Sequence, residues 1–246
     1  MNPRTVAILQ ARMTSTRLPG KVLKPLMGKP MLWHQINRLK ACPLIDEIVI
    51  ATTENSTDDP IIDFGRKIQM RVVRGSEKDV LSRYNKAAKM TAAEIVVRIT
   101  SDCPLIDPDI VGRVILHLRE NPEKFDYVSN TVRRTYPRGL DTEVMWRDVF
   151  DRMVRMAQSE PAHEHVTWFI HQEQPSLFRL GNIVDNEDNS DLRWTVDTPQ
   201  DFEMVKAVYE TLHLDTHQVK YRDLVKFVRE NPAIAAINSS IQQKTH

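Results

Sequence analysis

The chain has 246 residues, of which 41% are hydrophobic and 27% charged, and its 34 Lys and Arg nearly balance its 33 Asp and Glu. These values are typical of one globular domain of the larger α/β type, and they exclude bulk disorder, collagen-like repeats and a disulfide scaffold. The formal net charge is only +1, whereas nucleic-acid-binding domains usually carry an excess of basic residues. Two cysteines without CxxC spacing favour a reducing, cytoplasmic location, and no apolar run is long enough to span a membrane. We therefore expect a soluble protein with neither nucleic acid nor membrane as a partner.

The first 130 residues alternate strand and helix patterns, which favours a mostly parallel sheet with right-handed crossovers. Strands are predicted at residues 5–11, 45–52, 71–73, 94–100 and 126–131. Helices are predicted at residues 29–40, from about 58, from about 80 to 90, and at 108–118. These elements predict an α/β domain with a three-layer core.

The pattern changes after residue 131, where the chain becomes more polar and richer in His, Trp and Pro. We interpret residues 132–192 as an insertion, within a single domain spanning 1–246, that closes over a site or joins two subunits. The elements predicted in and after it are a helix at 146–157, a strand at 192–197, and helices at 198–212 and 221–229. The tail from Ser239 is expected to fray.

The densest polar group is the sequence QARMTSTRLPGK at positions 10–21, directly after the first predicted strand. An open parallel sheet places its ligand crevice there. Arg12, Arg17 and Lys21 provide three cations within ten residues, with no acidic side chain among them. Such a loop can wrap a polyphosphate, since each charged hydrogen bond contributes roughly 1.5–3 kcal/mol; a solvated basic loop is the alternative. Val22 excludes a Walker A loop, which needs Ser or Thr after its lysine.

Two carboxylates stand at the ends of predicted strands. Asp102 follows the strand at 94–100, on the same face as Arg98, and Asp197 ends the strand at 192–197. Mg²⁺ binds through one or two carboxylates plus phosphate oxygens, so the pair suits a site for phosphoryl or nucleotidyl transfer. The alternatives are that Asp102 caps the following turn and that Asp197 caps the next helix.

Three other residues with possible chemistry lie near these motifs. Cys103 is expected to be a small buried thiol rather than a nucleophile. His163 and His165 form an HxH pair without further clustered His or Cys, which favours structural or lid roles over zinc binding.

The motif at 10–21 resembles the signature of the cytidylyltransferases that activate acidic sugars, namely the acylneuraminate and 3-deoxy-manno-octulosonate enzymes, and especially their branch of spore-coat polysaccharide biosynthesis proteins. Matches in the family's order run from about residue 5 to 203, so the resemblance covers most of the chain. It continues through GSEKDVLSRY (75–84), RITSDCPLIDP (98–108), YPRGLDTEV (136–144), HEHVT (163–167) and RWTVDTPQD (193–201).

The resemblance implies a glycosyltransferase-A-like α/β fold that binds CTP and Mg²⁺ and transfers a cytidylyl group to an acidic sugar, releasing pyrophosphate for surface polysaccharide synthesis. It also implies a homodimer. The nucleotide would be bound by Gln10, Ala11, Arg12, Arg17, Lys21 and Arg98, with Ser76 and Asp79 near the ribose and base. The acceptor would be lined by Arg138, Asp141 and Glu143, and the metal would be held by Asp102 and Asp197. Arg12, Lys21 and Asp102 would be the catalytic residues.

Two departures from the family pattern leave the sugar open. Val22 stands where the acylneuraminate enzymes usually have Asn, and His163 stands where this branch often has Arg. Two other functions are alternatives: a glycosyltransferase that uses a nucleotide-sugar donor on the same fold, and a non-catalytic nucleotide-binding protein. The DxD pattern that the glycosyltransferase needs occurs only formally, at 107–109, where it opens a predicted helix.

Overall fold

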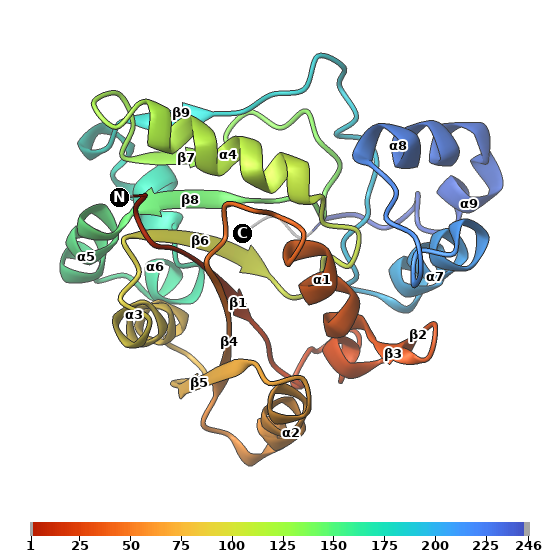
Figure 1. Cartoon of the computed structure of the whole chain (residues 1–246), viewed down its shortest axis with the longest axis horizontal. Coiled ribbons are helices and arrows are strands. Elements are labelled where there is room, and N and C mark those ends of the chain that lie inside the picture. The colour runs from red at the N-terminus through yellow and green to blue at the C-terminus, as the bar shows by residue number, and fades with distance from the viewer. Residues whose placement is uncertain (1, 244–246) are drawn as a thin grey trace.

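A seven-stranded mixed sheet forms the centre of the computed structural model, which describes residues 2–243 (Figure 1). In spatial order its strands are β5 (Arg71–Gly75), β4 (Glu47–Thr53), β1 (Thr5–Gln10), β6 (Ile95–Thr100), β8 (Glu143–Trp146), β7 (Tyr127–Ser129) and β9 (Leu180–Asn182). Only β8 is reversed, because it pairs antiparallel with both β6 and β7 while every other pairing is parallel. The predicted α/β fold with a mostly parallel sheet is confirmed.

Helices cover both faces of this sheet because its central strands are apolar on both sides. In β1, Val6 and Ile8 pack on one face and Ala7 and Leu9 on the other, and all four are fully buried. The first face is covered by α3 (Val80–Met90), α5 (Arg147–Met156) and α6 (Glu160–Glu164). The second is covered by α1 (Met31–Leu39), α2 (Asp59–Lys67) and α4 (Pro108–Glu120). The result is a three-layer core.

A third apolar cluster lies beside the sheet and is built from the C-terminal helices (Figure 1). These are α7 (Pro199–Leu212), α8 (Tyr221–Glu230) and α9 (Pro232–Ala236). They pack around Trp194, one of the largest fully buried side chains. The cluster anchors the segment that precedes α7, and that segment carries Asp197.

The remaining regular elements are short. They are the hairpin strands β2 (Pro25–Leu26) and β3 (Lys29–Pro30), the 3₁₀ turns Lys21–Leu23, Ser56–Asp58 and Pro175–Leu177, and a π-helical turn at Phe169–Glu173. The helix predicted at 29–40 therefore begins only at Met31, because residues 29–30 pair in the hairpin. No helix within residues 2–243 is long and apolar enough to cross a membrane.

The prediction of a strand at 192–197 is wrong. This segment makes a single isolated bridge, from Arg193 to Arg138, because its backbone partners are loops. The amide of Trp194 donates to the Arg138 carbonyl, and that of Val196 donates to the Asp102 carbonyl. The segment runs between two loops, and that position carries Asp197 to the carboxyl end of β6.

Residues 132–192, interpreted from the sequence as an insertion, supply two strands of the main sheet. They contain β8, which pairs with β6, and β9, which pairs with β7. Because β8 is reversed, its first residues lie beside the last residues of β6, with Glu143 opposite Arg98. The loop before β8 therefore reaches the same edge of the sheet as the loops that follow β1 and β6.

Gly139 fixes that loop against the segment before α7, and this gives a test of the fold. Its φ is +106°, and a Cβ there would lie 2.6 Å from the Trp194 carbonyl carbon. Gly28 also has a positive φ, +75°, but a Cβ there would meet nothing within 4 Å. We expect Gly28→Ala to cost about 1 kcal/mol, from backbone strain alone. Gly139→Ala should cost about 2–4 kcal/mol, because overpacking adds to the strain.

Urea unfolding of both variants against the unmodified chain measures the two costs. Equal losses would contradict the close packing of Gly139 on the Trp194 backbone.

Candidate active site

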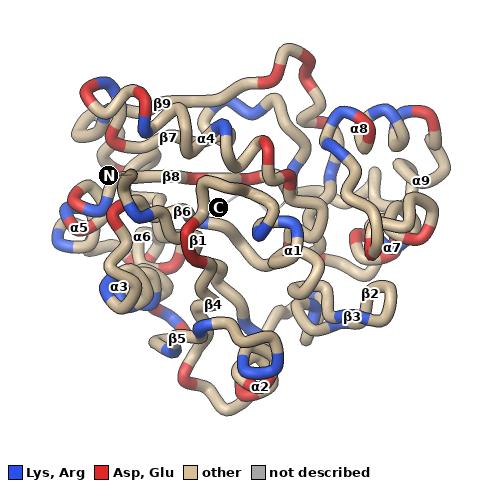
Figure 2. The backbone as a smooth tube through the Cα atoms, in the orientation of Figure 1, with Lys and Arg blue, Asp and Glu red and all other residues tan. Residues whose placement is uncertain are grey.

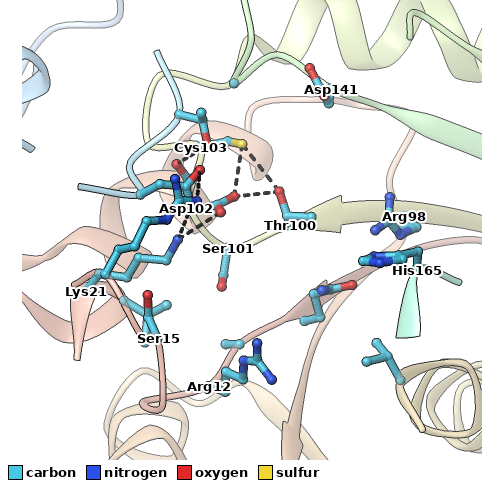
Figure 3. A pocket seen from close by; sticks show the side chains of 18 of the residues that line it. Arg12, Ser15, Lys21, Arg98, Thr100, Ser101, Asp102, Cys103, Asp141 and His165 are labelled. Atoms are coloured by element: carbon cyan, nitrogen blue, oxygen red, sulfur yellow. Dashed lines mark hydrogen bonds and ion pairs between the residues drawn. The ribbon is translucent and has the colours of Figure 1, made fainter. Parts of the chain in front are cut away.

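A cavity of about 620 Å³ opens at the carboxyl ends of β1 and β6 (Figure 3). Its volume lies within the range of small-molecule sites. It brings together most of the residues singled out from the sequence. Those lining it are Gln10, Ala11, Arg12, Arg17, Lys21, Arg98, Asp102, Arg138, Asp141 and Asp197.

Lys21 lies at the centre of the polar network. Its Nζ donates to Asp102 Oδ2 at 3.0 Å, to Asp197 Oδ1 at 2.9 Å and to the Val196 carbonyl at 2.8 Å. Figure 3 shows Lys21 directed at Asp102. Gly20, with φ +70°, precedes the 3₁₀ turn that begins at Lys21 and fixes its backbone. One ammonium thus joins the N-terminal loop to two carboxylates that follow it far along the sequence.

The electrostatics of this network favour the charged forms of its members. Burial raises the pKa of Asp102, but the Lys21 ammonium and hydrogen bonds from Thr100 and Lys21 outweigh it and lower that pKa to about 2. Burial likewise lowers the pKa of Lys21, but Asp102 and Asp197 outweigh it, so the net change is upward. The Lys21 ammonium therefore faces an ionised Asp102 carboxylate at neutral pH.

Asp197 does not cap the following helix, which was one alternative from the sequence. Thr198 caps α7 and forms a reciprocal capping box with Asp201. The carboxylate of Asp197 is left to accept from Lys21, from Arg17 Nη2 at 3.0 Å and from Arg193 Nη2 at 3.0 Å. Three cationic side chains therefore contact this one carboxylate.

The two carboxylates fit the requirements of Mg²⁺. Oxygens of Asp102 and Asp197 already converge on one cation, the Lys21 ammonium. Within residues 2–243 no group of three or more His, Cys, Asp and Glu is placed to hold a metal. Mg²⁺ commonly takes only one or two protein carboxylates and fills its remaining positions with water and substrate phosphates. Asp102 and Asp197 therefore suit an ion that arrives with a phosphate ligand.

The basic loop is anchored at its base and open at its tip. The Met13 amide donates to the buried Asp58, which also accepts from Thr52 and Thr53 at the end of β4. Arg12 is exposed, and nothing in residues 2–243 holds its guanidinium by a hydrogen bond or ion pair. Around the whole cavity, six cationic side chains face four carboxylates. Elsewhere both signs are interspersed over the outer helices and loops (Figure 2), so the basic character is local.

Three residues that the resemblance assigned to nucleotide or acceptor binding, Ser76, Asp79 and Glu143, do not line the cavity. Glu143 is buried under it, where its carboxylate pairs with Arg98 and accepts from the Tyr127 hydroxyl at 2.9 Å. Burial raises the pKa of Glu143, but Arg98 and the hydrogen bonds lower it overall. Glu143 neutralises Arg98, and the structure places it beneath the lining to which the resemblance assigned it.

Ser76 and Asp79 form the N-terminal cap of α3 instead of lining the cavity. The Asp79 side chain accepts from the Ser82 amide at 2.8 Å and pairs with His163 Nδ1 at 2.9 Å. Ser76 Oγ accepts from the Asp79 amide at 3.1 Å. Their polar atoms are used within the cap, and His163 joins α6 to it through its contact with Asp79.

The opposite wall of the cavity is formed by the loop before β8. Asp141 is held by a bidentate pair with Arg134, at 2.5 and 2.7 Å. Arg138 has no carboxylate partner within residues 2–243, and burial lowers the pKa of its guanidinium. In Figure 3, Asp141 lies above and Arg12 below the level of the Lys21–Asp102 pair. The loop before β8 and the basic loop thus line different parts of the cavity.

Sequence reasoning missed several residues of the wall. Arg83, Glu164, Thr195 and Gln243 also line the cavity, as does His165, for which the sequence favoured a structural or lid role. The buried stripe of α3 gave a signal for Arg83, which lies between the apolar positions Leu81 and Tyr84. Gln243 had no such signal, because the tail was expected to fray from residue 239. Through residue 243 the tail is placed, with the Gln243 amide oxygen accepting from Arg193; the rest of that expectation lies outside the described residues.

Cys103 is buried as expected. Burial and the neighbouring Asp102 carboxylate both raise the pKa of its thiol well above the ordinary value, so it is a poor nucleophile.

The Lys21 network predicts a pH-dependent stability. Lys21→Met leaves Asp102 without its cation, which we expect to cost about 1–3 kcal/mol at pH 7. Because the folded pKa of Asp102, about 2, lies below its ordinary value of 3.8, the pair stabilises the fold above about pH 4. That contribution is lost as the pH falls toward 2.

The difference in free energy of unfolding between the unmodified chain and Lys21→Met should therefore shrink between pH 4 and 2. Lys40→Met, which removes an exposed lysine outside the cavity, is the matched control and should change little at any pH. A Lys21→Met cost that is constant over this range would contradict the pairing.

Comparison with known proteins places this site in a family. Residues 6–226 match the family model described as "Cytidylyltransferase". The uncharacterized protein MJ1063 of Methanocaldococcus jannaschii is 34% identical over 99% of this chain and 98% of its own length. The spore coat polysaccharide biosynthesis protein SpsF of Bacillus subtilis is 32% identical over 93% of this chain and 95% of its own.

Solved structures agree. A cytidylyltransferase from Leptospira borgpetersenii superposes with a TM-score of 0.89 at 30% identity, covering 99% of this chain and all of that one. A CMP:2-keto-3-deoxy-manno-octonic acid synthetase, determined in complex with CTP, superposes with a TM-score of 0.63 at 19% identity, covering 85% and 99%. The second likeness concerns the fold alone. These matches over nearly the whole chain, together with the basic loop and the Asp102 and Asp197 carboxylates, show that it belongs to the cytidylyltransferase family.

Proposed function

We propose that this protein transfers a cytidylyl group from CTP to an acidic sugar, with release of pyrophosphate, in the synthesis of a surface polysaccharide. The observation that carries the proposal is the Lys21 ammonium held between Asp102 and Asp197 in a cavity edged by the basic loop. The name of the SpsF relative supports a polysaccharide route, and the CTP complex of the octonic acid synthetase supports the nucleotide.

The charges of the cavity suit a triphosphate. Arg12 has no ion-pair partner within residues 2–243 and Arg17 reaches the same carboxylate as Lys21, so three cations stand where a chain of phosphates would lie. A triphosphate would take over hydrogen bonds that Lys21 now makes to Asp102 and Asp197. The two carboxylates would then hold Mg²⁺, which when bound neutralises charge on the phosphates. Lys21 could thus exchange its carboxylate partners, Asp102 and Asp197, for the phosphates of the nucleotide.

The reaction asks little covalent chemistry of the protein. An acceptor hydroxyl oxygen bonds to the α-phosphorus, the bond from that phosphorus to the bridging oxygen of the β-phosphate breaks, and pyrophosphate leaves with that oxygen. The hydroxyl proton passes to solvent. Arg12, Arg17 and Lys21 orient the phosphates and stabilise the charge that develops on them. Arg138, which lacks a carboxylate partner, can pair with the carboxylate of the acceptor.

Pyrophosphate release tests the reaction. CTP, UTP, ATP and GTP are each assayed with Mg²⁺, with and without a pool of acidic sugars. We expect release with CTP only, and only when the pool is present. Asp102→Asn should lower that rate at least about a hundredfold, because it removes one of two metal-binding carboxylates. Asp109→Asn, an exposed carboxylate in the first turn of α4, is the matched control.

Other outcomes separate the alternatives. Release of a nucleoside diphosphate from a nucleotide sugar would favour a glycosyltransferase. CTP binding without turnover on any pooled acid would favour a nucleotide-binding protein, and failure to bind CTP would exclude the proposal.

A further inference from the structure

The C-terminal segment, residues 237–243, returns from α9 to the active-site cavity. Ile237 packs against the third apolar cluster, and Gln243 lines the cavity. Between them, Asn238 is only 3% exposed. Polar side chains near the end of a chain are usually solvated, and a buried one needs hydrogen-bond partners. The partners of this segment therefore show what its burial serves.

Asn238 binds two groups around the segment that precedes α7. Its Nδ2 donates to the Arg193 carbonyl at 3.0 Å and to Asp201 Oδ1 at 2.9 Å. Asp201 is fully buried. Burial raises the pKa of this carboxyl, but hydrogen bonds from Arg193 and Asn238 outweigh it and lower the pKa overall. Asn238 thus helps to keep a buried carboxylate charged.

Asp201 in turn fixes both the backbone and the side chain around Asp197. Its Oδ2 accepts from the amides of Asp197 at 3.0 Å and Thr198 at 2.9 Å. Its two oxygens also accept from Arg193, from Nε at 2.8 Å and from Nη2 at 3.1 Å. One buried carboxylate therefore sets the position of Asp197 and of the guanidinium beside it.

Arg193 connects the C-terminal segment to the Asp197 side chain. All three of its guanidinium nitrogens are used: Nη1 donates to Gln243 Oε1, and Nη2 lies 3.0 Å from Asp197 Oδ2. Arg17 also reaches that oxygen, but the proposed function assigns Arg17 to the phosphates. Arg193 is therefore the partner that stays on Asp197 when a triphosphate is bound.

A carboxylate that binds a metal ion has to keep a fixed direction. Residues that hold such ligands commonly change metal affinity tenfold to a hundredfold when they are mutated. We propose that Asn238 and Gln243 are positioning residues that keep Asp197 directed at the metal ion. They act through Arg193 and Asp201, both of which contact Asp197 directly. The inference rests on the proposed function, which assigns Mg²⁺ to this carboxylate.

Calorimetric binding of inorganic tripolyphosphate to the full chain, once with Mg²⁺ and once with EDTA, tests this role. The ratio of the two affinities is the gain due to the metal ion. Asn238→Leu should lower that gain at least about fivefold and Gln243→Met about threefold, because Arg193 loses a fixed point. The affinity in EDTA should stay within twofold, since the basic loop is unchanged.

Variants of the same segment give the controls. Gln243→Glu keeps an acceptor for Arg193 and should keep the gain within twofold. Ser240→Ala and Gln242→Met change exposed positions of the segment and should have no effect.

Two results would overturn the inference while leaving the proposed function intact. One is an unchanged or larger gain in both Asn238→Leu and Gln243→Met. The other is an equal loss of affinity with Mg²⁺ and with EDTA, which would give the segment a general structural role. Should Asn238→Leu not fold, the contrast between Gln243→Met and Gln243→Glu decides.

The probe also separates this inference from the reaction. If the unmodified chain shows no gain with Mg²⁺, the metal-binding role of Asp197 and the positioning role fall together. Because tripolyphosphate contains neither nucleotide nor sugar, a failure of cytidylyl transfer in the pyrophosphate assay would not change the result.

Discussion

The contact of the Lys21 ammonium with Asp102 and Asp197 organises the rest of the structure. It joins Lys21 to Asp102, 81 positions further along the sequence, and to Asp197, 176 positions further along. Each partner arrives by a different route: Lys21 on a loop after β1, Asp102 at the end of β6, and Asp197 on a segment anchored by the C-terminal helices. Three separately packed parts of the chain therefore have to dock before the site exists. The cost of burying three charges is offset because each charge faces an opposite one.

The same contact explains how one cavity can serve two states. Without a ligand, the lysine satisfies both carboxylates, so the fold does not hold an unpaired negative pair. With a triphosphate and its metal ion, both the lysine and the carboxylates would gain new partners of the right sign. Arg193 holds the other oxygen of Asp197 and would keep that side chain in place. The site is preorganised by charge pairs that a substrate can replace.

Much of the first half of the chain could be predicted from its sequence, because strands buried on both faces and amphipathic helices leave strong local patterns. The basic loop and Asp102 were also local signals, since polar residues directly follow an apolar strand. Segment 192–197 was misassigned because its β-rich composition reflects burial under α7–α9, while its backbone bonds go to loops. Glu143 and Asp79 were misplaced because a carboxylate gives no indication of which partner it will find: here these are Arg98 and the amide end of α3. Such choices depend on tertiary contacts that periodicity does not record.

Because β8 runs opposite to its neighbours, two different parts of the chain form the walls of the cavity. The parallel β-α-β units carry the loop after β1, the carboxylate after β6 and the wall on α3, and a change in any of them disturbs the three-layer core. The opposite wall comes from the loop that enters β8, which is held by its pairing beside β6, the Arg138–Arg193 bridge, the Arg134–Asp141 pair and the close approach at Gly139. Because this wall lies outside the parallel β-α-β units, its exposed side chains can change without disturbing the packing of those units. Under the proposed function, the acceptor could therefore differ while the nucleotide chemistry is kept.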